Sequence, residues 1–106
     1  MSEVFMYVTC ESEDQAGIIG KALVEERLAA CVNILGGMRS LYWWDGAVQQ
    51  GDETVLIAKT RDDLTDAATD RIKALHPYEV PCVVCLPITG GNDDFLEWIR
   101  AETGRK

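Results

Sequence analysis

Three stretches of this chain are apolar at nearly every position, without the alternation of apolar and polar residues that a half-exposed strand shows. They are Val4–Val8, Thr54–Ala58 and Cys82–Leu86. Their length and their β-branched residues predict strands. A strand with one face in water is polar at every second position, so these strands must be buried on both faces of a sheet. The fold therefore has to provide a cover for two sheet faces.

A long hairpin pattern lies in the middle of the chain. Its first arm, Cys31–Trp44, is interrupted by Gly36-Gly37, and paired glycines within extended structure indicate a bulge. Asp45-Gly46 is typical of a tight hairpin turn, after which Ala47–Gln50 returns. Gly51-Asp52 predicts a second irregularity in the returning arm. The sequence thus predicts two strands that pair across one turn.

The lengths of these strands differ strongly. At about 3.3 Å per residue, the first strand reaches roughly 20 Å and Cys31–Trp44 roughly 45 Å. The hairpin therefore overhangs its own sheet. Because Tyr42, Trp43 and Trp44 are close to its tip, we expect the hairpin to lie on the surface of a neighbouring subunit.

Three segments follow the periodicity of helices. The first begins at Ser12, with Gln15 placed as in a capping box; the others are Thr60–Leu75 and the segment from Asn92 to Ile99. The order strand, helix, strand, strand, helix, strand predicts an α+β ferredoxin-like plait, here with an added C-terminal helix, in one domain over residues 1–106. In that plait two helices cover one sheet face. One short extra helix cannot cover the other face, so we expect a homo-oligomer.

Charge and composition exclude several classes of function. The net charge of −8 repels phosphate, which argues against nucleic acid and anionic membranes as partners. No stretch is long and apolar enough to span a membrane, and the first residues lack the pattern of a secretory signal. The four cysteines are interpreted as reduced thiols. We therefore expect a cytoplasmic protein.

The segment His76–Pro81 combines a helix end with polar chemistry. Pro77 disfavours helix at the preceding residue, so the second helix should end at His76. In a plait, this loop, the end of the first strand and the hairpin lie at the same end of the sheet. Cys10, the hairpin aromatics and the loop are therefore expected to form a cleft, within one chain or between subunits.

The residue types in this cleft fit a soft or borderline divalent metal such as Cu²⁺, with His76, Glu79 and Cys10 as ligands. The alternative is a rigid connector whose histidine caps the helix end. Tyr42, Trp44 and Tyr78 are expected to line the cleft. Lys59 either binds an anion there or runs along the sheet to reach water. Cys82 and Cys85 point to opposite faces of a strand, so we interpret them as core residues rather than a chelating pair.

Motifs along nearly the whole chain resemble those of the CutA family, the divalent-cation tolerance proteins. The residues that carry the resemblance are Leu28–Ile34, Ser40, Tyr42, Trp44, Gly46, Lys59-Thr60, His76–Pro81, Gly91, Phe95-Leu96 and Trp98. Phe95 replaces a common tyrosine, and Cys10 lies where proline or alanine is frequent. The resemblance implies a homotrimer with hairpins paired between subunits, an architecture similar to PII signalling proteins, and a link to copper and divalent-metal tolerance without an established catalytic activity.

The leading hypothesis is a non-enzymatic trimer that binds a divalent metal or a small ligand at clefts between subunits. The alternative is a PII-like signalling adaptor whose main partner is another protein. A small hydrolase on this fold lacks a cationic phosphate cradle. An RNA-binding plait conflicts with the acidic charge.

Overall fold

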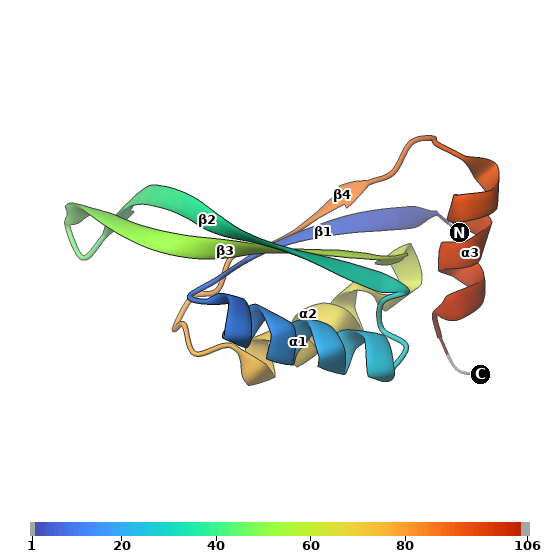
Figure 1. Cartoon of the computed structure of the whole chain (residues 1–106), viewed down its shortest axis with the longest axis horizontal. Coiled ribbons are helices and arrows are strands. Elements are labelled where there is room, and N and C mark those ends of the chain that lie inside the picture. The colour runs from blue at the N-terminus through green and yellow to red at the C-terminus, as the bar shows by residue number, and fades with distance from the viewer. Residues whose placement is uncertain (1, 105–106) are drawn as a thin grey trace.

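The computed structural model describes residues 2–104 and shows an α+β fold in which one sheet carries two helices on one face (Figure 1). The elements are β1 (Glu3–Cys10), α1 (Glu13–Glu25), β2 (Cys31–Trp44), β3 (Ala47–Arg61), a 3-10 turn (Asp62–Leu64), α2 (Thr65–Leu75), β4 (Val83–Pro87) and α3 (Asp93–Glu102). The strands are antiparallel in the order β2-β3-β1-β4. This is the predicted ferredoxin-like plait. Residues 1, 105 and 106 of the predicted single domain lie outside the described residues.

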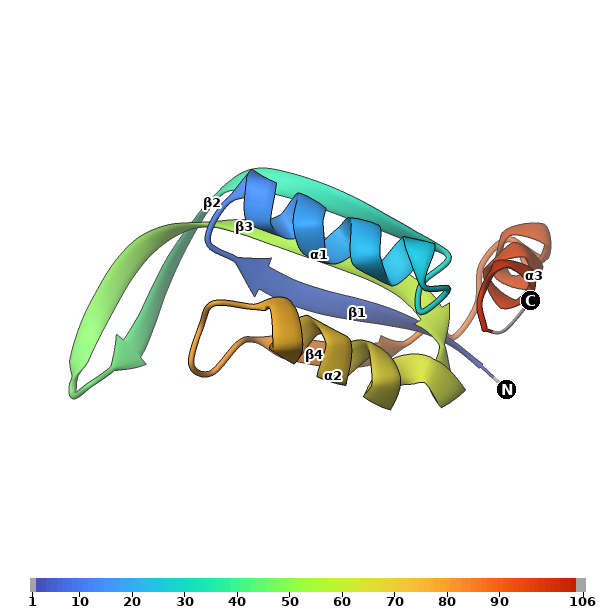
Figure 2. The same ribbon diagram turned by 90° about the horizontal axis from the view of Figure 1, so that it is seen from below.

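The core lies between the sheet and the two helices α1 and α2, which run side by side beneath it (Figure 2). On β1, the buried side chains alternate with half-buried ones, as expected for a strand with helices on one face. The core contains Val4, Met6, Val8 and Cys10 from β1, Ala16, Ile19 and Leu23 from α1, Leu56 and Ala58 from β3, and Ala68 and Ile72 from α2. The apolar helix stripes of the sequence thus face the sheet.

Residue Gln15 connects the beginning of α1 to the end of α2. The Ser12 hydroxyl oxygen accepts a hydrogen bond of 3.1 Å from the Gln15 backbone N–H, as the capping box predicts. The Gln15 side chain does not complete that box; its Nε2 donates to the Leu75 carbonyl at 3.0 Å. Leu75 is the last residue of α2, and His76 after it is extended, with φ −82° and ψ 134°. The helix therefore ends where Pro77 requires it.

Two sequence expectations about β3 and α2 are wrong. The irregularity expected at Gly51 does not occur, because Gly51 pairs in regular register with Ser40. The helix expected from Thr60 begins at Thr65. Thr60 instead pairs with Val4 of β1, and this pairing extends the strand to Arg61. Tertiary pairing thus overrides the local helical pattern.

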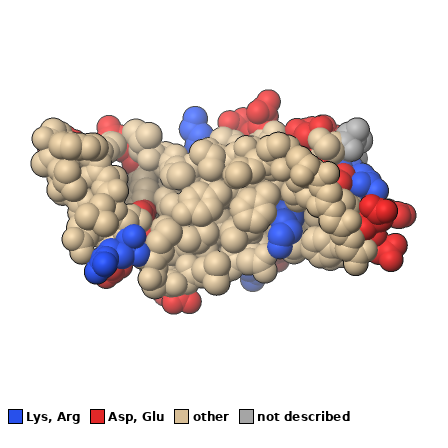
Figure 3. All heavy atoms as spheres, turned by 90° about the horizontal axis from the view of Figure 1, so that it is seen from above, with Lys and Arg blue, Asp and Glu red and all other residues tan. Residues whose placement is uncertain are grey.

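The face of the sheet opposite α1 and α2, called the open face below, is covered at one end only. There α3 packs against β1 and β3, and Arg100 Nη1 lies 2.7 Å from Glu3 Oε2. Elsewhere apolar side chains remain exposed: Leu35 by 58%, Val84 by 49% and Leu86 by 47%. Figure 3 shows this side of the molecule, which is largely uncharged. A single chain therefore leaves an apolar sheet face without a cover among residues 2–104.

The hairpin of β2 and β3 projects beyond the other strands (Figures 1 and 2). β1 ends at Cys10, opposite Thr54, whereas β2 and β3 continue to pair from Met38 and Glu53 outward to the turn. Asp45 and Gly46 both have positive φ, 55° and 79°, as a type I′ turn requires. The predicted overhang is present, and the molecule measures 44 × 25 × 21 Å. No helix within residues 2–104 combines the length and the apolar character needed to cross a membrane.

Candidate functional site

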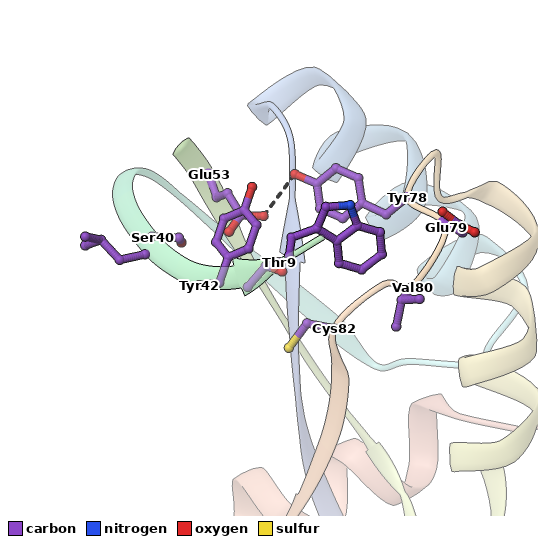
Figure 4. A pocket seen from close by; sticks show the side chains of 10 residues that line it. Thr9, Ser40, Tyr42, Glu53, Tyr78, Glu79, Val80 and Cys82 are labelled. Atoms are coloured by element: carbon purple, nitrogen blue, oxygen red, sulfur yellow. Dashed lines mark hydrogen bonds between the residues drawn. The ribbon is translucent and has the colours of Figure 1, made fainter. Parts of the chain in front are cut away.

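A cavity of about 580 Å³ lies at the root of the projecting hairpin. Three separate segments form it: the end of β1, the hairpin, and the loop between α2 and β4 (Figure 4). These are the segments that the plait topology predicts at one end of the sheet. The lining residues are Thr9, Ser40, Leu41, Tyr42, Trp44, Glu53, Tyr78, Glu79, Val80 and Cys82.

A bulge in β2 directs the hairpin aromatics toward this cavity. Leu35 stands opposite Val55, and Met38 stands opposite Glu53, so β2 has one residue more than β3 between these pairs. Because side chains alternate along a strand, one extra residue exchanges the two faces for everything that follows. Tyr42 and Trp44 consequently share the open face with Glu53. Gly37 allows this geometry, since its φ of +79° is unfavourable for residues with a Cβ.

His76 is a buried residue that holds the loop against β1. Its Nε2 lies 2.7 Å from the Thr9 carbonyl oxygen, and its Nδ1 accepts a hydrogen bond of 3.2 Å from the Tyr78 backbone N–H. A nitrogen that accepts from a backbone N–H carries no proton, so the hydrogen is assigned to Nε2, which donates to Thr9. The side chain therefore positions the loop rather than capping α2.

Tyr78 and Glu53 form the polar centre of the cavity. The Tyr78 hydroxyl donates a hydrogen bond of 2.9 Å to Glu53 Oε2 (Figure 4). Burial raises the pKa of Tyr78, and the hydrogen bond to Glu53 and the charges of Glu53 and Glu11 raise it further. The phenol therefore stays protonated and remains a hydrogen-bond donor to the carboxylate.

Cys10 lies next to this centre, on the opposite, helix-covered face of the sheet. Its side chain is fully buried in the core. Burial, followed by the charge of Glu53, raises the pKa of its thiol from 9.0 to about 11. A protonated, buried thiol is a poor metal ligand and a poor nucleophile. Cys82 and Cys85 were expected in the core, but both are exposed. Cys85 lies on the edge strand β4, and Cys82 lies in the loop before it, at the cavity.

The three residues predicted as metal ligands differ in their availability. Glu79 is exposed and lines the cavity, whereas His76 uses both ring nitrogens within the chain and Cys10 points into the core. No group of three or more His, Cys, Asp or Glu side chains within residues 2–104 is arranged to hold a metal ion. A metal centre built from one chain therefore does not fit these residues, and the metal role of Cys10, His76 and Glu79 stays a prediction.

The residues predicted to line the cleft separate into two groups. Tyr42, Trp44 and Tyr78 line the cavity together. Lys59 lies nearer the other end of the sheet, because it pairs with Phe5 of β1. Its Nζ donates to Asn33 Oδ1 at 2.7 Å and lies 5.8 Å from the centre of the Phe95 ring.

Glu53 is the charged residue among the lining residues that sequence reasoning missed, which also include Thr9, Leu41 and Cys82. The alternation of side chains along β3 predicts which face Glu53 occupies, because Glu53 is two residues from Val55 and so lies on the same face as Val55. Its acidic neighbour Asp52 and the supposed irregularity at Gly51 obscured that signal. With Glu53 included, the cavity contains three aromatic rings and two carboxylates.

Comparison with known proteins relates the chain to one family over nearly its whole length. The family model described as CutA1 divalent ion tolerance protein matches residues 4–102. The divalent-cation tolerance protein CutA of Thermus thermophilus is 50% identical over 104 residues, which cover 98% of this chain and 100% of that protein. A solved structure of the divalent cation tolerance protein from Thermus thermophilus superimposes with a TM-score of 0.94, at 49% identity over 96% of this chain and 99% of that one.

A plant relative is longer than this chain. The rice protein named "Protein CutA 1, chloroplastic" is 46% identical over 100 residues, and the matched region covers 94% of this chain and 56% of the rice protein. The chain thus spans about half the length of that relative. Because the rice protein is named for the chloroplast, relatives differ in compartment, and the cytoplasmic location of this chain stays a prediction.

Proposed function

Because the chain belongs to the CutA1 divalent ion tolerance family, we propose that it is a non-enzymatic homotrimer that takes part in the tolerance of divalent cations, copper included. It does so in the cytoplasm by binding a divalent metal ion or a small ligand at clefts between its subunits. The observation that carries this proposal is the position of the cavity, at the root of a projecting hairpin and beside an uncovered apolar sheet face.

The exposed apolar surface supports assembly of several copies. Leu35, Val84 and Leu86 on the open face, and Trp43 on the hairpin, which is 75% exposed, would all lie in water in a single chain. Large contiguous apolar patches on a small protein mark interaction surfaces. The number of three subunits is taken from the family resemblance.

The hairpin explains why a cleft at its root would become shared. It projects past the end of β1, so it has no partner within its own sheet on that side. A second subunit that packs against the hairpin and the open face would border the cavity that Tyr42, Trp44 and Tyr78 line. Ligand binding and assembly would then depend on the same residues.

A divalent metal would have to draw on ligands from more than one subunit. Glu79 is exposed at the cavity and is ready to contact a cation. His76 would first have to release the Tyr78 N–H or the Thr9 carbonyl. Cys10 would have to leave the core and lose the proton of its thiol, whose pKa is raised to about 11.

Two measurements on the full chain test this proposal. Sedimentation should give three times the mass of the chain; a folded protein that sediments as a single subunit would contradict it. Titration of Cu²⁺ is then compared between the wild type, the double substitution His76→Ala/Glu79→Ala, and Asp70→Asn as a control on the exposed side of α2. A weaker affinity for Cu²⁺ in the double variant alone supports the metal role. Identical affinities in all three proteins would show that His76 and Glu79 do not bind the metal.

The second candidate is a PII-like signalling adaptor whose main partner is another protein. The exposed apolar side chains of the hairpin, Leu41, Trp43 and Val48, favour it because they suit contact with a protein surface. Capture of one specific protein from cell extract, equally with and without divalent metal and lost in Trp43→Ser, would favour the adaptor over the metal-binding role.

A further inference from the structure

The walls of the cavity at the hairpin root have a distinctive composition. Tyr42, Trp44 and Tyr78 contribute aromatic rings, and Glu53 and Glu79 contribute carboxylates. None of the described residues that line the cavity is a lysine, an arginine or a histidine. Figure 4 shows Tyr42 and Tyr78 close to the Glu53 carboxylate, with Glu79 apart from them on the loop. Aromatic and anionic groups thus surround one space without a positive charge of the protein.

Aromatic rings and carboxylates attract the same kind of ligand. The face of an aromatic ring is electrically negative and attracts a cation that lies within about 6 Å of its centre. A carboxylate at the base of such a site adds a full negative charge. The negative potential is also visible in neighbouring groups, because the charge of Glu53 helps to raise the pKa values of both Tyr78 and Cys10. The site therefore favours a cation over a neutral or anionic ligand.

The size of the site and its donor atoms favour an organic cation over a bare metal ion. The volume of about 580 Å³ lies within the range of small-molecule sites. One Glu53 oxygen is already bonded to the Tyr78 hydroxyl, and residues 2–104 contain no cluster of three metal-ligating side chains. Quaternary ammonium groups carry no N–H, so they need no hydrogen-bond acceptor, and they are recognised by aromatic faces. Few polar groups and several rings suit such a ligand.

We propose that this cavity binds a small organic cation with an alkylammonium head, held between the rings of Tyr42, Trp44 and Tyr78 and the carboxylate of Glu53. The inference rests on the proposed function to the extent that both place a ligand in this cleft. It goes further in naming the chemical class of the ligand, and it assigns Glu53 and Trp44 to binding.

The first test uses two probes of the same shape and different charge. Choline is compared with 3,3-dimethylbutan-1-ol, its neutral carbon analogue, by calorimetric titration of the wild-type protein. We expect saturable choline binding with a Kd below about 1 mM and binding of the neutral analogue weaker by about tenfold or more. Equal affinities, or no saturable binding of choline, would overturn the proposal without any substitution in the protein.

The second test uses substitutions with a matched control. Glu53→Gln removes the charge at nearly constant shape, and Trp44→Leu removes a ring; each should weaken choline binding by about tenfold. Trp98→Leu is the control, because Trp98 is a partly exposed tryptophan on α3 and does not line the cavity. An equal loss in Trp98→Leu would show that the loss of any tryptophan ring, and not the ring of Trp44 in the cavity, is responsible.

Sedimentation of each protein separates this inference from the proposed function. In one outcome the protein is a trimer, and its affinity for Cu²⁺ is lower in His76→Ala/Glu79→Ala, but it does not distinguish choline from its neutral analogue. This outcome contradicts the binding of an organic cation and leaves the proposed function in place. In the other outcome the protein is a single folded subunit that still binds choline, with a lower affinity in Glu53→Gln. This outcome contradicts a cleft between subunits and supports the binding of an organic cation.

Discussion

The Tyr78 hydroxyl donates a 2.9 Å hydrogen bond to Glu53, and this contact joins the loop after α2 to the root of the hairpin. Glu53 stands opposite Met38, the first residue of β2 after the bulge. His76 holds the other side of the same loop to the Thr9 carbonyl of β1. The three segments of the cavity are thus connected by two side-chain contacts.

We expect Tyr78→Phe to lower the free energy of unfolding by about 1–2 kcal/mol, since a hydrogen bond to a charged group is lost in a half-buried place. Urea unfolding at one fixed protein concentration measures this change. Tyr42→Phe is the control, because Tyr42 lines the same cavity and its hydroxyl makes no hydrogen bond within residues 2–104. If the two substitutions cost the same, the contact with Glu53 does not stabilise the fold.

Cys10 should make the stability of the protein depend on alkaline pH. The thiol loses its proton near 9.0 in the unfolded chain and near 11 in the folded one. Between these values the unfolded state binds fewer protons, so the free energy of unfolding falls as pH rises; below this window the contribution is fully present. Between about pH 9 and 11, the free energy of unfolding should therefore fall more steeply in the wild type than in Cys10→Ala.

Urea unfolding at several pH values compares the two proteins. Tyr78 has a raised pKa as well and acts in the same direction, but it is present in both, so the difference between the curves reports Cys10. Parallel curves would mean that the folded protein does not hold the proton of this thiol more tightly than the unfolded chain does.

Much of the fold follows from patterns within single segments. The apolar runs, the stripe of α1 and the restriction that Pro77 places on His76 each act over a few residues, so the strands, the first helix and the end of α2 were predicted from sequence. The convergence of the end of β1, the hairpin and the loop after α2 followed from the topology, because the plait fixes which ends of its strands lie together. Cys10 and Trp43 were expected in the same cleft but do not line it.

What the sequence did not predict depends on contacts between distant residues. Thr60 belongs to a helical pattern but extends β3, because Val4 pairs with it. Gln15 belongs to a capping box but bonds to Leu75, which is 60 residues away. The orientation of Tyr42 and Trp44 depends on one extra residue in β2, and two adjacent glycines do not by themselves say how many residues a bulge adds.

Gly37 should be the sensitive residue of that bulge. Gly37→Ala places a Cβ on a residue with φ +79°, which should cost about 1–2 kcal/mol in the free energy of unfolding. Gly36→Ala is the matched control: its Cβ would stand 2.6 Å from Glu13 Oε2, the end of a flexible exposed side chain that can move away, so the cost should stay below about 0.5 kcal/mol. Thermal unfolding of both variants measures whether Gly37→Ala destabilises the protein more than Gly36→Ala does. A larger cost at Gly36 would contradict the assignment of the strain to Gly37.

Two buried threonines should respond in opposite directions to the same substitution. Thr60 Oγ1 is buried on the helix-covered face and has no hydrogen-bond partner within residues 2–104, so Thr60→Val should raise the free energy of unfolding by about 1 kcal/mol. Thr103 Oγ1 is also buried but donates a hydrogen bond of 2.8 Å to the Ile99 carbonyl. Thr103→Val should therefore lower the free energy of unfolding by about 1 kcal/mol. Because the side-chain shapes are nearly identical in both exchanges, urea unfolding of the two variants reports the hydroxyl groups. A loss of stability in Thr60→Val would show that its hydroxyl is satisfied in solution, for example by a buried water molecule.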